Sequence, residues 1–210
     1  METDTMLLAA VRSMDGDAIE KVFDLYAHAL FKYVFRFCEN ALIADQIVGD
    51  VFSKLLEHLA AGGGPTANLR SYLFEMAYHQ IVDETRYSHR RVSLEAVETL
   101  LPESAPPSHI IENRLMFETV LGAIKNDLTD YQRHVIVLRF LEGFSLSETG
   151  AILGKSARDI KAAQCRAIRK LRQALEWELG QERKQRAAAP RSYRNHLTDY
   201  NSPAQVGEPG

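Results

Sequence analysis

Apolar residues recur along this chain at the three- and four-residue spacing of amphipathic helices, and no segment keeps the alternation typical of a strand. In the first part of the chain this pattern predicts helices over residues 4–13, 17–38, 41–60 and 67–86. Asp17 and Glu20 have the spacing of a capping pair at the start of the second of these helices. The run Gly62–Pro65 should end the third. We therefore expect a small helical bundle.

The helical pattern stops after residue 86, in a stretch with three prolines, and returns at residue 109. Beyond residue 180 there is no apolar stripe, and the chain ends in a segment rich in proline and glycine, which predicts disorder. The expected fold class is all-α, with two small helical domains joined by a flexible linker and followed by a disordered C-terminal tail. The predicted parts are a front domain (1–88), a linker (89–108), a back domain (109–180) and a tail (181–210).

The net charge of −3 is an average over two unlike parts of the chain. Residues 1–86 contain seven Lys and Arg against thirteen Asp and Glu, a net charge of −6. Residues 112–175 contain eleven against seven, a net charge of +4. An acidic front and a basic back are typical of a protein that meets two different partners.

Composition argues against several classes of protein. The sequence contains no run of about 18 apolar residues, so a membrane span is not expected, and the acidic start does not resemble a secretion signal. Cys38 and Cys165 lie far apart, outside any CxxC pair, which favours a reducing cytoplasm over a disulfide framework. The seven histidines show no HExxH spacing, so neither a metal site nor a cofactor is expected.

Residues 144–164, FSLSETGAILGKSARDIKAAQ, have the local signals of two short helices joined by a tight turn. Ser145 and Glu148 are spaced as a capping box, and Gly154 suits the left-handed residue that ends a helix. Ser156 can cap the second helix, with Asp159 near the positive end of its dipole. This arrangement is typical of a helix-turn-helix that binds DNA.

The second of these helices has two distinct faces. Ile160, Ala163 and Ala167 fall on the inward face together with later leucines. The outward face is predicted to consist of Arg158, Lys161, Ala162, Cys165, Arg166 and Arg169. Basic residues at this spacing can follow DNA phosphates, and small residues among them allow close approach in the major groove. An amphipathic hairpin with a solvated basic face remains the alternative interpretation.

Three strings in this order carry a resemblance to a known family. They are ALIADQIVGDVFSKLLEHL at 41–59, LRSYLFEMAYHQIVDETR at 69–86, and LTDYQRHVIVLRFLEGFSLSETGAILGKSARDIKAAQCRAIRKLRQAL from residue 128. Read together, residues 12–176 resemble a bacterial RNA polymerase sigma factor of the extracytoplasmic-function (ECF) group of the sigma-70 family. The resemblance implies that the front domain is the family's region 2 and that the back domain is its region 4.

For the front domain, the resemblance implies two binding surfaces. Contacts with the clamp helices of the largest polymerase subunit would come from Asp45, Gln46, Val48, Gly49, Asp50, Phe52 and Ser53. Contacts with the melted minus-ten element, including a flipped base beside the loop 62–68, would come from Asn68, Arg70, Ser71, Tyr72, Tyr78 and His79. Val48, Phe52, Tyr72 and the glycine run have an alternative interpretation as parts of the core and a simple helix stop.

For the back domain, the resemblance implies that the outward face read above holds the minus-thirty-five element. It further implies a contact with the flap of the second polymerase subunit and an anti-sigma factor as a regulator. The linker, with Glu95, Glu98 and Glu103, would thread through the polymerase, although a plain spacer fits its composition equally well. Such a protein is cytoplasmic and is not an enzyme.

The sequence departs from the family pattern at several of these positions. Gly49 replaces a usual glutamine, Tyr72 a tryptophan, His79 an asparagine and Asp159 a threonine. These departures predict an unusual promoter preference.

Two other classes of function stay open at this stage. One is a helix-turn-helix regulator that binds operator DNA without polymerase. The other is a metal enzyme using Asp45, Asp50 and Glu57, whose spacings of five and seven residues do not place all three on one helix face.

Overall fold

The computed structural model describes residues 2–91 and 119–188, and within them the side chains of residues 6–86 and 119–177. Every regular element in these ranges is a helix, and the described part of the chain contains no strand. The predicted all-α fold class is therefore confirmed. The predicted linker carboxylates Glu95, Glu98 and Glu103, and the last part of the predicted tail, lie outside the described residues.

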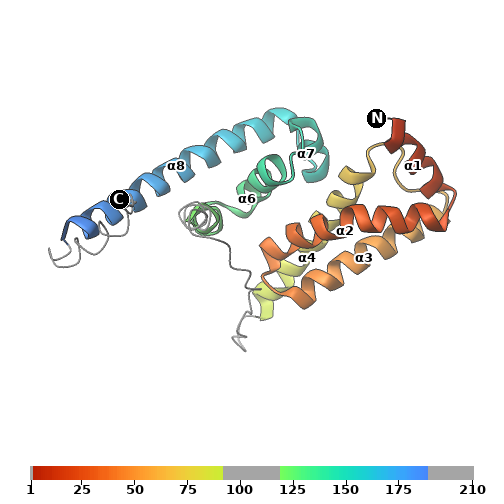
Figure 1. The fold of residues 1–210 in the computed structure, drawn as a ribbon, viewed down its shortest axis with the longest axis horizontal. Helices are drawn as coiled ribbons and strands as arrows, with labels where there is room; N and C mark the ends of the chain where they lie inside the picture. Colours follow the sequence, from red (N-terminus) through yellow and green to blue (C-terminus); the bar gives the residue numbers. More distant parts are fainter. Residues whose placement is uncertain (1, 92–118, 189–210) are drawn as a thin grey trace, which may run out of the picture.

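The front domain is built from α1 (Glu2–Arg12), α2 (Gly16–Cys38), α3 (Ala41–Ala60) and α4 (Leu69–Arg91), as Figure 1 shows. Helices α2 and α3 run antiparallel, with α4 packed against both. The bounds of α2 and α3 agree closely with the apolar stripes of the sequence. Helix α4 begins two residues later than expected because Asn68 has a left-handed backbone (φ 41°) and caps its first turn.

Helices α2, α3 and α4 each begin at a polar side chain that satisfies free backbone N–H groups. The Asn40 side chain accepts from the N–H groups of Leu42 and Ile43 at the start of α3. Helix α2 is capped by Asp15, whose carboxylate accepts from Ala18 N–H at 2.9 Å. The expectation of a capping pair at Asp17 and Glu20 was therefore wrong by two residues, because the chain is already helical at Gly16.

The back domain contains a helical segment over residues 119–127, α6 (Asp130–Ile136), a π-helical turn η1 (Val137–Leu141), α7 (Leu146–Leu153) and α8 (Ala157–Ala188). The helical pattern that returns at residue 109 predicts ordinary α-helical turns here. Instead, the Glu142 N–H donates to the Val137 carbonyl at 3.0 Å, an i to i+5 bond that adds a residue to the turn. Helix α8 also continues eight residues past residue 180, where the tail was predicted to begin.

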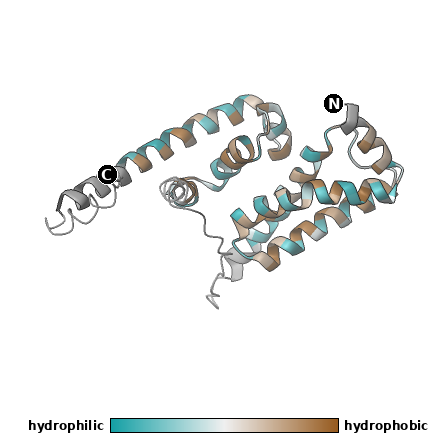
Figure 2. Ribbon diagram, in the orientation of Figure 1, coloured by the Kyte–Doolittle hydropathy of each residue, from teal (hydrophilic) through white to brown (hydrophobic). Residues whose placement is uncertain are grey.

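Apolar side chains of the front helices meet in one core. Figure 2 shows hydrophobic residues recurring along α2, α3 and α4, and their buried members form one cluster. The largest side chains sealed in this core are Leu30, Tyr33, Leu55, Leu73, Phe74 and Ile81. This core does not stop at the domain boundary, because Phe144 and Leu138 of the back domain belong to the same buried cluster.

The two domains pack directly against each other, with α7 lying on α4. Phe74 of α4 and Phe144, just before α7, meet edge to face with ring centroids 4.9 Å apart, and both are fully buried. No short-range signal in the sequence predicted this contact, which joins residues 70 positions apart. None of the helices in the described ranges is long and apolar enough to span a bilayer.

Candidate nucleic-acid interface

Helices α7 and α8 form the helix-turn-helix that the sequence predicted, and its local signals act as expected. The Ser145 hydroxyl accepts from Glu148 N–H at 3.2 Å, and the Glu148 carboxylate accepts from Ser145 N–H at 2.8 Å. Gly154 ends α7 with φ 62° and ψ 38°, a conformation that favours glycine. The turn is also tight at Gly150, where a Cβ atom would lie 2.6 Å from the Lys155 carbonyl oxygen.

Ser156 and Asp159 are paired with each other at the start of α8. The Ser156 hydroxyl accepts from Asp159 N–H at 3.1 Å and donates to the Asp159 carboxylate at 2.7 Å. The hydrogen bond from the Ser156 hydroxyl foremost, and a backbone hydrogen bond from Ser156 as well, lower the pKa of Asp159, so that the side chain is ionised at neutral pH. One function of this acidic residue is therefore local, since it holds the cap of α8.

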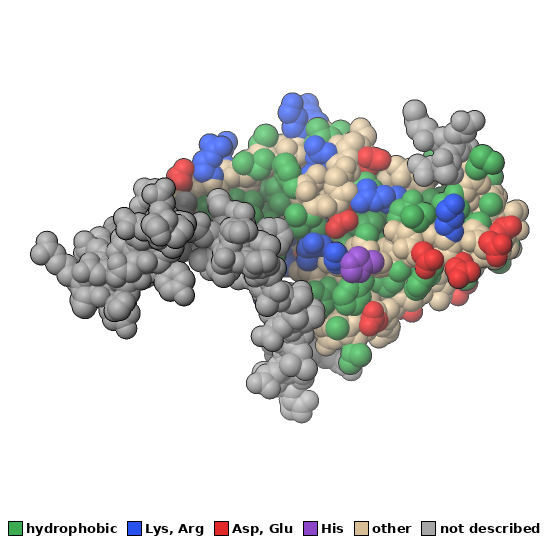
Figure 3. All heavy atoms as spheres, in the orientation of Figure 1, with side chains coloured by type: hydrophobic (Ala, Val, Ile, Leu, Met, Phe, Trp, Pro, Cys, Tyr) green, Lys and Arg blue, Asp and Glu red, His purple; other side chains and the backbone are tan. Residues whose placement is uncertain are grey.

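Helix α8 has the two faces that the sequence predicted. Ile160, Ala163 and Ala167 are completely buried against α6 and α7. The side chains predicted to face outward, Arg158, Lys161, Ala162, Cys165, Arg166 and Arg169, are all exposed. Figure 3 shows basic side chains along the outer edge over α8, whereas acidic side chains gather over the front domain. The charge asymmetry of the sequence is thus an asymmetry of two surfaces.

Arg139 braces the helix-turn-helix from η1. Its Nε–H donates to Gln164 of α8 at 3.1 Å, and its Nη1 donates to the Phe144 carbonyl in the loop before α7. Arg139 lies within the third family string, but sequence reasoning assigned it no role. A half-buried arginine with two partners on different elements fixes the orientation of α8 relative to α7.

In the front domain, the loop between α3 and α4 lies at the edge of a shallow concavity of about 460 Å³. Gly62 and Gly64 have φ values of 75° and 86°, and the Arg12 guanidinium donates to the Pro65 carbonyl at 2.8 Å. The loop side of the concavity is lined by residues 64–68, by Ser71, Tyr72 and Glu75 of α4, and the opposite side by Ser147, Glu148 and Ala151 of α7. A surface predicted to bind unpaired bases therefore faces the back domain.

Three of the residues predicted to contact the minus-ten element are engaged by the back domain. Asn68 Nδ2 donates to Glu148 Oε1 at 2.7 Å. Arg70 donates to the Glu142 carbonyl oxygen at 2.6 Å, and its guanidinium lies 4.1 Å from the centre of the Phe144 ring.

The third engaged residue is Tyr78, whose ring packs edge to face on the buried His134 with centroids 4.9 Å apart.

The other predicted minus-ten residues have different surroundings. The Ser71 hydroxyl is buried and has no hydrogen-bond partner among the described residues. The Tyr72 hydroxyl shares a short hydrogen bond with His58 Nδ1, and burial, assisted by Glu75, raises the pKa of Tyr72. His79 is exposed to solvent. The structure thus brings Asn68, Ser71 and Tyr72 around one concavity and places Tyr78 and His79 away from it.

Burial divides the predicted polymerase-binding residues of α3 into two groups. Val48 and Phe52 are core residues, with exposed fractions of 7% and 8%, so they do not offer their side chains to a partner. The exposed members are Asp45, Gln46, Gly49, Asp50 and Ser53. Sequence reasoning missed Phe23 of α2, whose ring lies 4.8 Å from that of Phe52 and remains 48% exposed. The apolar spacing of α2 does not show that this ring would be exposed beside a buried one.

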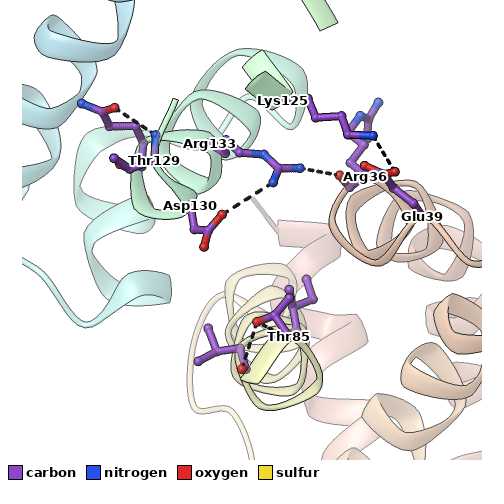
Figure 4. Close-up of polar contacts among 10 residues, drawn as sticks. Arg36, Glu39, Thr85, Lys125, Thr129, Asp130 and Arg133 are labelled. Atoms are coloured by element: carbon purple, nitrogen blue, oxygen red, sulfur yellow. Dashed lines mark hydrogen bonds and ion pairs between the residues drawn. The ribbon is translucent and has the colours of Figure 1, made fainter. Parts of the chain in front are cut away.

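Hydrogen bonds and ion pairs also join the two domains at the C-terminal end of α2, away from the loop 62–68, as Figure 4 shows. Arg133 donates to the Arg36 carbonyl at 3.0 Å and pairs with Asp130 at 3.6 Å. Lys125 and Glu39 form an exposed ion pair of 2.6 Å. No group of three or more His, Cys, Asp or Glu in the described ranges is arranged to hold a metal ion.

Comparison with known proteins identifies relatives of both domains. The family model of Sigma-70, region 4 matches residues 126–173, which include α6, η1, α7 and the first half of α8. The chain is similar to the ECF RNA polymerase sigma factor BldN of Streptomyces coelicolor, with 24% identity over 172 residues. That match covers 80% of this chain and spans 64% of the length of BldN.

A second relative matches over almost its whole length. The ECF RNA polymerase sigma factor ShbA of Streptomyces griseus is 26% identical over 190 residues, which cover 83% of this chain and 98% of ShbA. Among solved structures, the fold resembles that of the sigma factor RpoE of Bartonella quintana in complex with the anti-sigma factor NepR. That match has a TM-score of 0.59 and 22% identity, and it covers 75% of this chain and 96% of RpoE.

Proposed function

We propose that this chain, which belongs to the ECF group of the sigma-70 family, is a transcription initiation factor that binds core RNA polymerase and directs it to specific promoters. The observation that carries this function is the capped helix-turn-helix α7–α8, with its exposed basic face, inside the stretch that matches Sigma-70, region 4. A factor of this kind is not an enzyme, and it works in the cytoplasm, where the polymerase is found.

The exposed face of α8 is proposed to read the minus-thirty-five element in the major groove. Its basic members, Arg158, Lys161, Arg166 and Arg169, are solvent-exposed along about three turns of helix, a spacing that suits phosphate contacts along a groove. Ala162 and Cys165 between them are small and exposed, which permits close approach to base edges.

The loop 62–68 and the start of α4 are proposed to bind the melted minus-ten element. The concavity beside Asn68, Ser71 and Tyr72 offers an aromatic ring for stacking and a buried hydroxyl with a free hydrogen-bonding capacity. Arg70, Tyr78 and His79 extend this surface along α4 as positions for backbone contacts.

The exposed face of α3 is proposed to bind the clamp helices of the largest polymerase subunit, and the back domain to contact the flap of the second subunit. Asp45 and Asp50 make this α3 face acidic, which suits a basic partner. An anti-sigma factor is proposed as a further partner, because the similarly folded RpoE was solved in complex with one.

Transcription in a purified system tests the proposal. The chain is added to core polymerase and a library of genomic templates, and specific transcripts that depend on the chain are expected. A pull-down of core polymerase with the tagged chain accompanies the assay. Operator binding without any retention of polymerase would identify a polymerase-independent regulator instead. If the chain gives no specific transcript and also retains no polymerase, the proposed function is rejected.

A further inference from the structure

His58, in the last turn of α3, holds the loop 62–68 and a residue of α4 at the same time. Its backbone carbonyl accepts from the Gly63 N–H at 2.8 Å, and its Nδ1 shares a hydrogen bond of 2.5 Å with the Tyr72 hydroxyl. The His58 and Tyr72 rings meet edge to face, with centroids 6.2 Å apart. Sequence reasoning gave His58 no role. One exposed residue therefore joins the end of α3, the loop and the start of α4, which follow one another along the chain in Figure 1.

The loop itself lies close against the last turns of α3. A Cβ atom at Gly63 would lie 3.2 Å from the His58 carbonyl oxygen, and one at Gly64 only 2.9 Å from the Leu59 side chain. Gly64 also has a φ of 86°, which favours glycine. Because this close packing fixes the loop against α3, the loop and the Tyr72 ring are held by the same support.

Three side chains of α4 face the concavity beside this loop. Ser71, Tyr72 and Glu75 all line it, because residues three and four positions apart lie together on one face of a helix. The Ser71 hydroxyl is buried and has no hydrogen-bond partner among the described residues. Tyr72 stays neutral at pH 7, since burial, and then Glu75, raise the pKa of its hydroxyl. The concavity thus combines an anchored neutral ring, an unpaired hydroxyl and a carboxylate.

This combination suits the edge of an unpaired base rather than the backbone of the strand. An aromatic ring can stack on any exposed base, whereas a carboxylate repels phosphate. A carboxylate also accepts hydrogen bonds from the amino group of a base, as acidic side chains do from cytosine. Adenine, cytosine and guanine each carry an exocyclic amino group, and thymine has carbonyl oxygens instead. A carboxylate at this place can therefore distinguish thymine from the other three bases.

We propose that Glu75 selects the unpaired base that enters this concavity, accepting a base with an exocyclic amino group and disfavouring thymine. Tyr72 stacks on that base, and His58 is the positioning residue that fixes the Tyr72 ring. This inference rests on the proposed function and deepens it, since it names the class of base that the minus-ten surface selects. Glu75 was not among the residues predicted to contact the minus-ten element. All of these groups lie on α3 and α4, so the front domain supplies the whole base-selecting surface.

Selection of forked DNA tests the role of Glu75. Forked duplexes are built on a promoter mapped in the transcription assay, with the unpaired minus-ten strand randomised, and they are bound to the chain assembled with core polymerase. The bound strands are sequenced for the unaltered chain, for Glu75→Gln and for Glu20→Gln. Glu20→Gln makes the same charge change at an exposed position of α2 outside the concavity, so it controls for the general loss of a negative charge.

In the unaltered chain, thymine is expected to be depleted about tenfold relative to the other bases at one unpaired position. Glu75→Gln should reduce this depletion to about twofold or less, because an amide donates to thymine carbonyls as readily as it accepts from amino groups. Glu20→Gln should leave the depletion unchanged.

Three results would overturn the inference and leave the proposed function intact. They are the absence of thymine depletion in the unaltered chain, a depletion that survives in Glu75→Gln, and an equal loss of depletion in both variants. If no fork is retained in a manner that depends on the chain, the proposed function is rejected, and the role of Glu75 is rejected with it.

The positioning role of His58 is measured by stacking rather than by affinity. The fluorescent base 2-aminopurine, which carries an amino group, is placed at the position that the selection identifies, where stacking on the Tyr72 ring quenches it. His58→Leu removes the hydrogen bond and is expected to raise the fluorescence about twofold. His58→Asn keeps a polar group near the place of Nδ1 and should restore the quenching.

A second background separates positioning from a general structural effect. In a Tyr72→Phe chain the hydroxyl is already missing, so His58→Leu should cause no further rise in fluorescence. Unchanged fluorescence in the single variant His58→Leu, or an equal rise in the Tyr72→Phe background, would show that His58 does not position the ring.

Discussion

Tyr33 of α2 and His134 of α6 share a buried hydrogen bond of 2.9 Å, although 101 positions separate them in the chain. The His134 ring also stacks on Phe37, with centroids 3.8 Å apart. Burial raises the pKa of the Tyr33 hydroxyl, whereas burial and the neighbouring Arg133 lower the pKa of His134 to about 3. Both groups are therefore neutral at pH 7, and a neutral polar pair joins the two domains at their centre.

Removing the Tyr33 hydroxyl should weaken this junction. Tyr33→Phe leaves the His134 nitrogen buried without its partner, and the free energy of unfolding in urea is expected to fall by about 1–3 kcal/mol. Tyr131→Phe is the matched control, because the Tyr131 hydroxyl is buried and has no hydrogen-bond partner among the described residues. Its loss should be neutral or slightly stabilising. Equal destabilisation by the two substitutions would contradict the importance of the Tyr33–His134 bond.

Acid should destabilise the folded chain through His134. Its pKa in the folded state is about 3, far below the ordinary value of 6.5, so the unfolded chain binds a proton that the folded chain does not. This contribution is fully present above pH 6.5 and is lost as the pH falls toward 3, by about 1.4 kcal/mol per pH unit.

Urea unfolding between pH 6.5 and pH 5 measures this effect as a loss of about 2 kcal/mol. Glu142 contributes with the opposite sign, since its raised pKa means that the folded state holds a proton more readily. Comparison with His134→Gln isolates the histidine, because the glutamine cannot titrate there. A variant that keeps the full pH slope of the unaltered chain would rule out His134 as the source.

Two glycine substitutions on helices should have opposite effects. Gly49 is exposed on α3 with open space around the position of a Cβ atom, so Gly49→Ala is expected to stabilise the fold by about 1 kcal/mol. Gly150→Ala places a Cβ atom 2.6 Å from the backbone oxygen of Lys155, so the turn before α8 must shift and stability should fall. Thermal unfolding of both variants checks the signs. A stabilised Gly150→Ala chain would show that the turn adapts freely.

The basic face of α8 should reveal itself in the salt dependence of DNA binding. If Lys161 and Arg166 each contact a phosphate, replacing either with alanine should lower the slope of log K against log salt by about one unit. Lys170→Ala is the control on the same helix, because its Nζ points toward the Asp127 carbonyl at 3.4 Å. Slopes that stay unchanged in all three variants would place this face against solvent or protein rather than DNA.

Charge reversal on α3 should separate polymerase binding from DNA binding. Asp50 is exposed on the proposed clamp-binding face, and Asp50→Lys is expected to weaken retention of core polymerase by about tenfold or more through like-charge repulsion. Duplex DNA binding by the same protein should not weaken. Glu20→Lys makes the same charge change at an exposed position of α2 and should retain polymerase. If both reversals weaken retention equally, overall charge rather than the α3 face attracts the polymerase.

Several parts of the interface could be predicted from neighbouring residues. The sequence predicts the capping box of Ser145 and Glu148, the left-handed Gly154 and the cap at Ser156, and the structure confirms all three. The exposed face of α8 followed from helical spacing in the same way. Each of these features depends on residues within four positions of one another, where backbone geometry leaves few alternatives.

Other features depended on packing and escaped prediction. Helical spacing placed Phe23 and Phe52 in stripes alike, yet Phe52 is buried and Phe23 is half exposed, because only the neighbouring helix decides which edge of a stripe is covered. The π-helical turn at Val137–Leu141 also depends on packing, because it turns both Val137 and Leu138 into the core. No periodicity of a single helix encodes either outcome.

By itself, the sequence determined the helices, their caps, the helix-turn-helix and the separation of an acidic front from a basic back. The tertiary structure alone decided that Glu142 and Glu148 face Arg70 and Asn68, and that His134 is sealed beneath Tyr33. The reason is physical. Caps and helical faces are set by hydrogen bonds and spacing within a few residues, whereas contacts between distant residues depend on how complete surfaces of side chains fit together.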